Sequence, residues 1–318
     1  MPNRWRRRAA LPKAILAWAA LAAAALLAAG CSSSSAAGQP GPGGKIIAVG
    51  AENEYADVIA QVGGKYVQAS AIMSNPNTDP HTFEASASTG RLVNAARLVV
   101  QNGLGYDTFM DTIEKAVPDS GRRTIVVQKL LGLPDSTPNP HLWYDPATMP
   151  KVADAIAASL AAIQPSHAAY FKANAKTFAN SLAPWINAIG TFKQHYPGTP
   201  VATTEPVADY LLQALGADNR TPWAFQADVM NGTDPSAQDV AIERSLFTEH
   251  KVKAFVYNQQ VTDSLTESFI SLARANHIPV VGVYETMPEP GYHYQSWMLA
   301  EVRALQKAVT SGVSSEHL

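Results

Sequence analysis

The chain has 318 residues, 47% of them hydrophobic, which is enough for one large domain or two moderate ones with buried cores. Five of its 24 basic residues and none of its 26 acidic ones lie before residue 31, so the remainder carries a net charge of about −7, which argues against nucleic acid as a partner. A single cysteine excludes an internal disulfide, so the fold must depend on its cores.

Residues 1–30 have the plan of a secretory signal peptide. A basic head is followed by an uncharged, mostly apolar run from position 14 to position 29, which is too short to span a membrane comfortably. The pair Arg7-Arg8 also loosely resembles a twin-arginine signal, so both the general secretory route and the twin-arginine route remain open. Either route exports the mature chain.

The end of this segment, "LLAAGC", resembles a bacterial lipobox, in which the thiol of the cysteine is acylated and the cysteine becomes the new N-terminus. Cys31 would then be the lipid attachment site, although Ala28 stands where a leucine is commonest. The alternative is an ordinary signal peptide with a chance cysteine. Residues 31–44 are rich in Ser, Gly and Pro and predict a flexible tether. We therefore expect a protein held on the outer face of the cytoplasmic membrane by an N-terminal lipid anchor.

Residues 45–165 alternate between short apolar runs and helical patterns. Strands are predicted at 45–50, 66–74, 97–102 and 124–128, and helices at 53–64 and 86–95. Strands that alternate with helices indicate parallel βαβ units covered on both faces. This part of the chain predicts an N-terminal α/β lobe.

Residues 166–196 predict one long linker helix. The apolar residues of one face are Phe171, Phe178, Leu182, Trp185, Ile189 and Phe192. Pro184 interrupts this stripe and should kink the helix or split it in two. Two ordinary surface helices are the alternative.

Residues 197–318 repeat the strand and helix rhythm. Strands are predicted at 201–205, 252–258 and 279–285, with helices ending near 216 and 276 and a last helix from about 294 to 311. The segment "GTDPSAQD" predicts a turn followed by a helix N-cap. The predicted fold is α/β: two lobes, each a parallel β-sheet flanked by helices, joined by one long linker helix.

Four side chains follow predicted strands at their carboxyl ends, where ligands gather in open α/β sheets. His81 and His141 each follow a stiff Asp-Pro or Asn-Pro pair, in "TDPHTFE" and "NPHLWYD". Glu205 and Glu285 end the strands "VATTE" and "VVGVYE". One pair comes from each half, so the residues predict a site in the cleft between lobes.

Two imidazoles and two carboxylates balance the charge of one divalent cation. Without a cation, two glutamates that face each other in a partly dry cleft would repel, and one would tend to take up a proton. Each glutamate alone is more simply explained as an N-cap or a solvated strand terminus. Four such residues at four strand ends favour a metal site.

The segments "TDPHTFEASAS", "VVQNGLG", "NPHLWYDP" and "VATTEPVADYLLQALG" resemble the manganese- and zinc-binding solute-binding lipoproteins of bacterial ABC importers. The resemblance runs from about residue 45 to the C-terminus. It implies two lobes joined by a rigid helix and a metal held by His81, His141, Glu205 and Glu285. It also implies a monomeric receptor, not an enzyme, that serves a permease and its cytoplasmic ATPase.

The resemblance is incomplete at two of the predicted ligands and leaves the metal open. Glu205 stands where many zinc-type members have a third histidine, and Glu285 stands where an aspartate is commonest, so Glu289 or His293 could serve in place of Glu285. Two carboxylates and the absence of a histidine-rich loop favour Mn²⁺ slightly over Zn²⁺ as cargo, with Fe²⁺ also compatible. The alternatives are an exported zinc-dependent hydrolase, which would need a general base that no motif supplies, and a receptor for an iron chelate or corrinoid.

Overall fold

The computed structural model describes residues 42–75, 83–84, 86–288 and 291–318, and residues 38–318 form one compact unit. The predicted signal peptide, Cys31, all but the last residues of the tether, His81 and Glu289 lie outside the described residues. No helix in the described ranges is both long enough and apolar enough to cross a bilayer.

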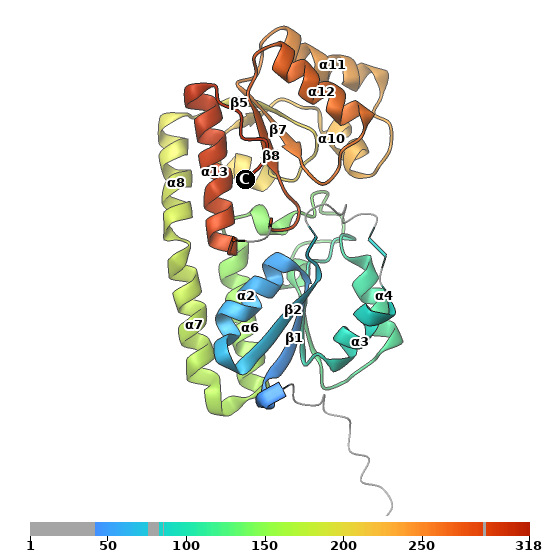
Figure 1. The fold of residues 1–318 in the computed structure, drawn as a ribbon, viewed down its shortest axis with the longest axis vertical. Helices are drawn as coiled ribbons and strands as arrows, with labels where there is room; N and C mark the ends of the chain where they lie inside the picture. Colours follow the sequence, from blue (N-terminus) through green and yellow to red (C-terminus); the bar gives the residue numbers. More distant parts are fainter. Residues whose placement is uncertain (1–41, 76–82, 85, 289–290) are drawn as a thin grey trace, which may run out of the picture. The chain divides into compact units, whose positions relative to one another are not determined.

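The N-terminal sheet has four parallel strands in the order β2-β1-β3-β4. Its strands are β1 (Ile46–Glu52), β2 (Val67–Met73), β3 (Leu98–Gln101) and β4 (Arg123–Val126). Its helices are α2 (Asn53–Gly63), α3 (Ala87–Ala95), α4 (Thr108–Ala116), α5 (Val127–Leu130) and α6 (Thr148–Ile163). Figure 1 shows α2 and α6 on one side of this sheet and α3 and α4 on the other. The strand β1 is central and almost wholly buried, as expected for a parallel sheet covered on both faces.

The C-terminal sheet repeats the plan, with four parallel strands in the order β6-β5-β7-β8. Its strands are β5 (Pro200–Thr203), β6 (Asp218–Asn219), β7 (Ala254–Asn258) and β8 (Val280–Val283). Its helices are α9 (Asp209–Leu215), α10 (Trp223–Met230), α11 (Ala237–Thr248), α12 (Ser264–Ala275) and α13 (Tyr294–Ser311). Ser236 caps α11 through its side-chain oxygen, which confirms the N-cap expected in "GTDPSAQD". The two parallel sheets confirm the predicted two-lobed α/β fold.

Two consecutive helices, α7 (Ala168–Ser181) and α8 (Ala183–His195), occupy the predicted linker region. The helices meet at Leu182, and Pro184 lies in the first turn of α8, where its missing N–H costs no hydrogen bond. The stripe from Phe171 to Phe192 is buried along both helices. The first helix packs on α2 and α6, and the second packs on α9 and α13. The predicted helix is therefore split at the proline and contacts both lobes.

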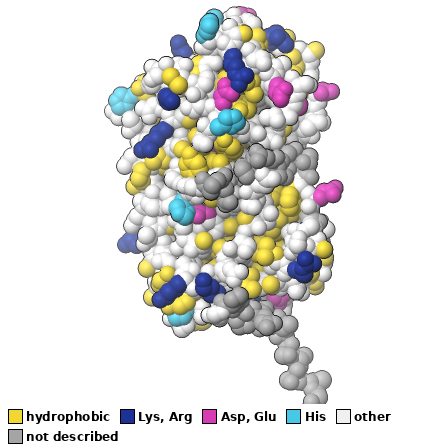
Figure 2. Space-filling view, in the orientation of Figure 1, with side chains coloured by type: hydrophobic (Ala, Val, Ile, Leu, Met, Phe, Trp, Pro, Cys, Tyr) yellow, Lys and Arg dark blue, Asp and Glu magenta, His cyan; other side chains and the backbone are white. Residues whose placement is uncertain are grey.

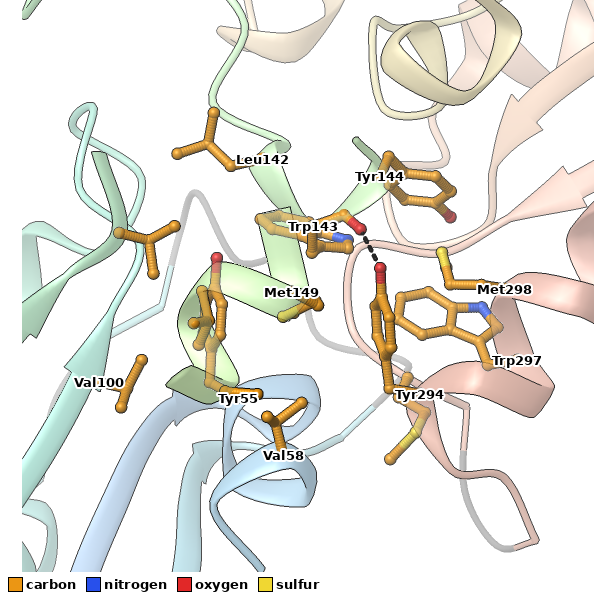
Figure 3. Packing of buried hydrophobic residues seen from close by; sticks show 14 of the residues in the cluster. Tyr55, Val58, Val100, Leu142, Trp143, Tyr144, Met149, Tyr294, Trp297 and Met298 are labelled. Carbon is orange, nitrogen blue, oxygen red and sulfur yellow. Dashed lines mark hydrogen bonds between the residues drawn. The ribbon is translucent and has the colours of Figure 1, made fainter. Parts of the chain in front are cut away.

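An aromatic cluster joins the two lobes (Figure 3). Trp143, Tyr294 and Trp297 are fully buried in one continuous hydrophobic core that reaches from the N-terminal sheet to α13. The hydroxyl group of Tyr294 donates to the main-chain oxygen of Trp143 at 2.6 Å, and that of Tyr144 donates to the main-chain oxygen of Tyr284 at 2.8 Å. These contacts hold the segment after His141 against β8 and α13.

The face of the molecule drawn in Figure 2 shows Lys and Arg side chains scattered singly and not gathered into one patch.

Candidate metal site

Three of the four predicted ligands lie within the described residues, and all three are buried. His141 precedes a short 3₁₀ turn from Leu142 to Tyr144 and is 0% exposed. Glu205 lies two residues beyond the last residue of β5, and Glu285 lies two residues beyond that of β8. Both glutamates therefore sit in the loops that leave the carboxyl ends of parallel strands, slightly later than the sequence pattern suggested.

The structure brings His141 and Glu285 into contact across the lobes. Their atoms Nε2 and Oε2 are 3.4 Å apart, and both side chains are fully buried. The hydroxyl group of Tyr106, which follows β3, donates to the same Oε2 atom at 3.0 Å. Burial raises the pKa of Tyr106 well above its usual range, and the charge of Glu285 raises it further. The phenol therefore stays protonated and serves as a hydrogen-bond donor to the carboxylate.

Asn258 connects the two predicted glutamate ligands. Its side-chain nitrogen donates to Oε1 of Glu285 at 2.6 Å and to Oε1 of Glu205 at 3.2 Å. It is the last residue of β7, which lies between β5 and β8, so its side chain can reach both loops. The main-chain nitrogen of Asn258 also donates to Thr204 at 3.0 Å. One neutral amide thus holds two buried carboxylates close together.

The imidazole of His141 and the carboxyl groups of Glu205 and Glu285 are chemically suited to bind a divalent ion. Imidazole nitrogen suits Zn²⁺ and other transition metals, and carboxylate oxygen suits Mn²⁺. Two buried carboxylates supported by neutral donors need a cation or protons to balance their charge. Among the residues that the structure describes, no three His, Cys, Asp or Glu side chains are arranged with the geometry of a metal site.

Two described residues that flank the segment with His81 lie near the residue that follows Glu285. Asn75 and Phe83 line a cavity of about 80 Å³ together with Thr286, the neighbour of Glu285. Asn75 and Phe83 therefore lie across this cavity from Thr286, and His81 itself lies outside the described residues.

The side chain of Asn139 fixes the position of His141. Its oxygen accepts from the main-chain nitrogen of His141 at 3.0 Å and lies 2.8 Å from Nδ1 of the ring. Its nitrogen donates to the carbonyl oxygen of Pro206 at 2.8 Å, directly after Glu205. The imidazole also makes edge contacts with the rings of Tyr106 and Trp143.

Two further glutamates near the site were missed in the sequence. Glu52 is the last residue of β1, and Glu54 lies in the first turn of α2; both are 0% exposed, and none of their carboxyl oxygens has a hydrogen-bond partner among the described residues. Burial raises the pKa of both well above the usual glutamate range. The charges of Asp107 and Glu54 raise the pKa of Glu52 further, and the charge of Glu285 raises that of Glu54 further. The signal was present, because Glu52 ends its strand much as Glu205 and Glu285 follow theirs. The sequence pattern ended that strand at Gly50.

His293, an alternative fourth ligand, occupies the N-cap of α13, where its Nδ1 lies 2.7 Å from Oδ1 of Asp57. Its side chain is 68% exposed, in contrast to the buried donors around Glu285. The other alternative, Glu289, lies outside the described residues.

Comparison with known proteins places the chain in a family. The family model described as zinc-uptake complex component A, periplasmic, matches residues 49–308. The manganese-binding lipoprotein MntA of Bacillus subtilis (strain 168) is 26% identical over 239 residues, which are 72% of this chain and 76% of MntA. The zinc-binding protein TroA of Treponema pallidum (strain Nichols) is 22% identical over 247 residues, or 75% of this chain and 79% of TroA.

A solved structure, the periplasmic zinc-binding protein TroA from Treponema pallidum, has the same fold. It superposes with a TM-score of 0.71 at 18% sequence identity, covering 85% of this chain and 100% of that chain. Because the family model spans most of the sequence, the chain belongs to the zinc-uptake component A family, the metal-binding receptors of bacterial ABC importers.

Proposed function

We propose that this receptor captures one divalent transition metal ion with His81, His141, Glu205 and Glu285 and delivers it to an ABC permease driven by a cytoplasmic ATPase. The contact between His141 and Glu285 carries the proposal, because it joins a buried nitrogen donor of one lobe to a buried oxygen donor of the other. Asn258 holds Glu205 against the same carboxylate. The chain acts as a binding protein and not as an enzyme.

The ion is Mn²⁺ in the cell, with Zn²⁺ as the tighter ligand in a test tube. Affinity rises from manganese to zinc at almost any site of nitrogen and oxygen donors. Two glutamates instead of a third imidazole make this site harder, and bidentate carboxylates can raise the coordination number above four, which favours manganese. The named relatives include a manganese-binding and a zinc-binding protein, so kinship alone selects neither ion.

The cargo is tested by uptake in a strain that lacks the gene. The strain is grown separately in manganese-poor and zinc-poor medium, and accumulation of each metal is measured with and without the restored gene. We expect a growth and uptake defect that manganese cures. A defect cured only by zinc would overturn the choice of manganese while leaving the receptor function in place.

The receptor is exported and works as a monomer tethered through lipidated Cys31. The segment "LLAAGC" and the low-complexity residues 31–44 support this, and one named relative is a lipoprotein. The variant Cys31→Ser is expected to leave membranes for the soluble fraction or to retain its signal peptide. Unchanged partition into membranes would contradict the anchor.

Binding itself is tested by titrating Zn²⁺ and Mn²⁺ into the purified mature protein in a calorimeter. We expect one ion per chain and a large loss of affinity in His81→Ala and in His141→Ala. The matched control is His195→Ala, since His195 is exposed on α8 and its ring bonds to the main-chain oxygen of Thr191 in the same helix. Affinity should also fall from pH 7 to pH 5, because histidine ligands must be neutral and their usual pKa is about 6.5. Equal metal affinity in His81→Ala, His141→Ala and His195→Ala would contradict the assignment of His81 and His141 as ligands.

A further inference from the structure

Asn139 lies where the two lobes meet, and its side chain is buried. Its amide oxygen faces His141, and its amide nitrogen faces the carbonyl oxygen of Pro206. His141 belongs to the loop before α6, and Pro206 follows Glu205 in the loop after β5. One amide group therefore contacts the loops that carry two of the proposed ligands, one from each lobe.

These neighbours allow only one orientation of the amide. The carbonyl oxygen of Pro206 requires a donor, and the main-chain N–H of His141 requires an acceptor, so the oxygen and nitrogen of Asn139 cannot be exchanged. An acceptor oxygen 2.8 Å from Nδ1 requires a proton on Nδ1. In a neutral ring the lone pair is then on Nε2.

That tautomer directs the ring toward the other lobe. Nε2 is the atom of His141 that lies 3.4 Å from the carboxylate of Glu285. Without an acceptor at Nδ1, the neutral ring would gain by placing its proton on Nε2 and donating it to Glu285. The proton would then occupy the position in which Nε2 can bind a metal. The oxygen of Asn139 opposes this rearrangement.

The nitrogen of Asn139 has a separate role, because it ties the histidine loop to the glutamate loop. A second contact does not involve the Asn139 side chain: the hydroxyl group of Tyr210, in the helix α9 that follows the glutamate loop, donates to the main-chain oxygen of Asn139 at 2.9 Å. Removing the Tyr210 hydroxyl would therefore weaken the contact between loops without touching the imidazole.

We propose that Asn139 is a positioning residue that sets the tautomer of His141 and ties its loop to the Glu205 loop, so that the ligands of the two lobes are oriented together. The proposal deepens the proposed function and rests on it. It also explains why an amide suits the position. Aspartate has the same shape and keeps the acceptor for His141, but it turns a second oxygen toward the carbonyl of Pro206. Alanine loses both contacts.

The tautomer is tested without metal by ¹⁵N NMR of histidine-labelled protein at pH 9, well above the usual histidine pKa of about 6.5. The His141 signals are assigned by their loss in His141→Ala. We expect protonated Nδ1 in the unchanged protein, in Asn139→Asp and in Tyr210→Phe, and a shift of the proton to Nε2 in Asn139→Ala. A proton that stays on Nδ1 in Asn139→Ala would overturn the positioning role.

The tie is tested by hydrogen exchange of the peptide that covers residues 139–145. Exchange should accelerate in Asn139→Asp and Asn139→Ala, and to a smaller extent in Tyr210→Phe. Unchanged exchange in Asn139→Asp would overturn the tie. Because Asn139→Asp and Tyr210→Phe preserve the imidazole contact, they also separate these effects from a general failure of Asn139→Ala to fold.

Calorimetry with Zn²⁺ then connects both roles to binding. Loss of a group that orients a metal-ligating histidine typically weakens affinity by about 10- to 100-fold, which we expect for Asn139→Ala, with a smaller loss for Asn139→Asp. Equal zinc affinity in Asn139→Ala and the unchanged protein would overturn the coupling to binding. If the unchanged protein bound neither Zn²⁺ nor Mn²⁺, the proposed function would fail, and the tautomer measurement would still decide whether Asn139 positions His141.

Discussion

Two pairs of buried glutamates lie at the carboxyl ends of the two sheets, and they differ in their partners. Glu205 and Glu285, in the C-terminal lobe, share the amide of Asn258. Glu52 and Glu54, in the N-terminal lobe, have no hydrogen-bond partner for their carboxyl oxygens among the described residues. A supported carboxylate can stay ionised for a cation, whereas an unsupported buried carboxyl holds its proton. Position at a strand end therefore does not by itself favour an ionised carboxylate; the hydrogen-bond donors around it do.

The difference between the two glutamate pairs should show most strongly when one glutamate of each pair is replaced by glutamine. Glu285→Gln removes the charge that faces His141 and should weaken Mn²⁺ and Zn²⁺ binding by roughly 100-fold or more, on the order of 3 kcal/mol. Glu52→Gln replaces a carboxyl group whose pKa is raised, chiefly by burial, with a neutral amide of the same shape, and should change affinity by less than about threefold. Calorimetry on both variants decides. Similar losses in the two would show that Glu52 is ionised and acts with the ligands.

Removing the amide of Asn258, which Glu205 and Glu285 share, should destabilise the folded protein even when no metal is bound. Asn258→Ala deletes two hydrogen bonds to the glutamate carboxyl groups and one from the main-chain N–H of Gln260. Each contributes about 1 kcal/mol, or about 1.5–3 kcal/mol where the carboxyl group is charged, so the free energy of unfolding should fall by about 3 kcal/mol or more. Asn231→Ala is the control, because its exposed amide donates to the main-chain oxygen of Ala227, four residues earlier in the chain. Urea unfolding of metal-free protein measures both. A loss below about 1 kcal/mol in Asn258→Ala would argue against charged carboxylates at this position.

Glu52 and Glu54, whose carboxyl groups lack hydrogen-bond partners among the described residues, should make the metal-free protein less stable as the pH rises. The pKa values of Glu52 and Glu54 are raised in the folded state, chiefly by burial, so their stabilising contribution is complete below the ordinary value of 4.5 and is lost as the pH rises toward the folded-state values. The slope is at most about 1.4 kcal/mol per pH unit for each carboxyl. The double variant Glu52→Gln with Glu54→Gln should flatten this part of the profile, whereas Glu267→Gln, at an exposed position, should not. The same pH dependence of the unfolding free energy in the double variant and in the unchanged protein would contradict raised pKa values of Glu52 and Glu54.

Among these residues, Tyr106 should make the smallest contribution to metal affinity, through its hydrogen bond to Glu285. Tyr106→Phe removes one hydrogen bond to Oε2 of Glu285 and keeps the ring beside His141. We expect a loss of metal affinity of about fivefold, near 1 kcal/mol, measured by the same calorimetry. A loss as large as that in Glu285→Gln would mean that the phenol oxygen itself binds the ion.

The fold could be predicted from the sequence more completely than the site. Alternating apolar runs and helical patterns located most strands and both ends of α13, because these patterns are local. The strand β6 was missed because it consists of two polar residues, Asp218 and Asn219, whose pairing with β5 depends on the assembled sheet. Pro184 indicated where the linker would break. Local sequence patterns were therefore sufficient for most elements other than β6.

The supporting residues of the site could not be found in the same way. Asn258 lies 53 residues from Glu205, and Asn139 lies 67 residues from Pro206, so only the folded chain shows what each amide contacts. Glu54 reads in the sequence as an acidic residue in the first turn of a helix, a common surface feature. In the folded chain Glu54 is fully buried, and Met287 of the other lobe bonds to the adjacent Asn53. Candidate ligands could therefore be proposed from the sequence, whereas the residues that support them could not.

The central claim is that one ion binds between donors of both lobes. Its most direct test is an anomalous-scattering map from crystals of the mature protein grown with Mn²⁺, recorded on both sides of the manganese absorption edge. We predict a single peak within bonding distance of a nitrogen of His81, Nε2 of His141 and carboxylate oxygens of Glu205 and Glu285. A peak that contacts donors of one lobe alone, or one beside His293 and Asp57, would contradict the claim.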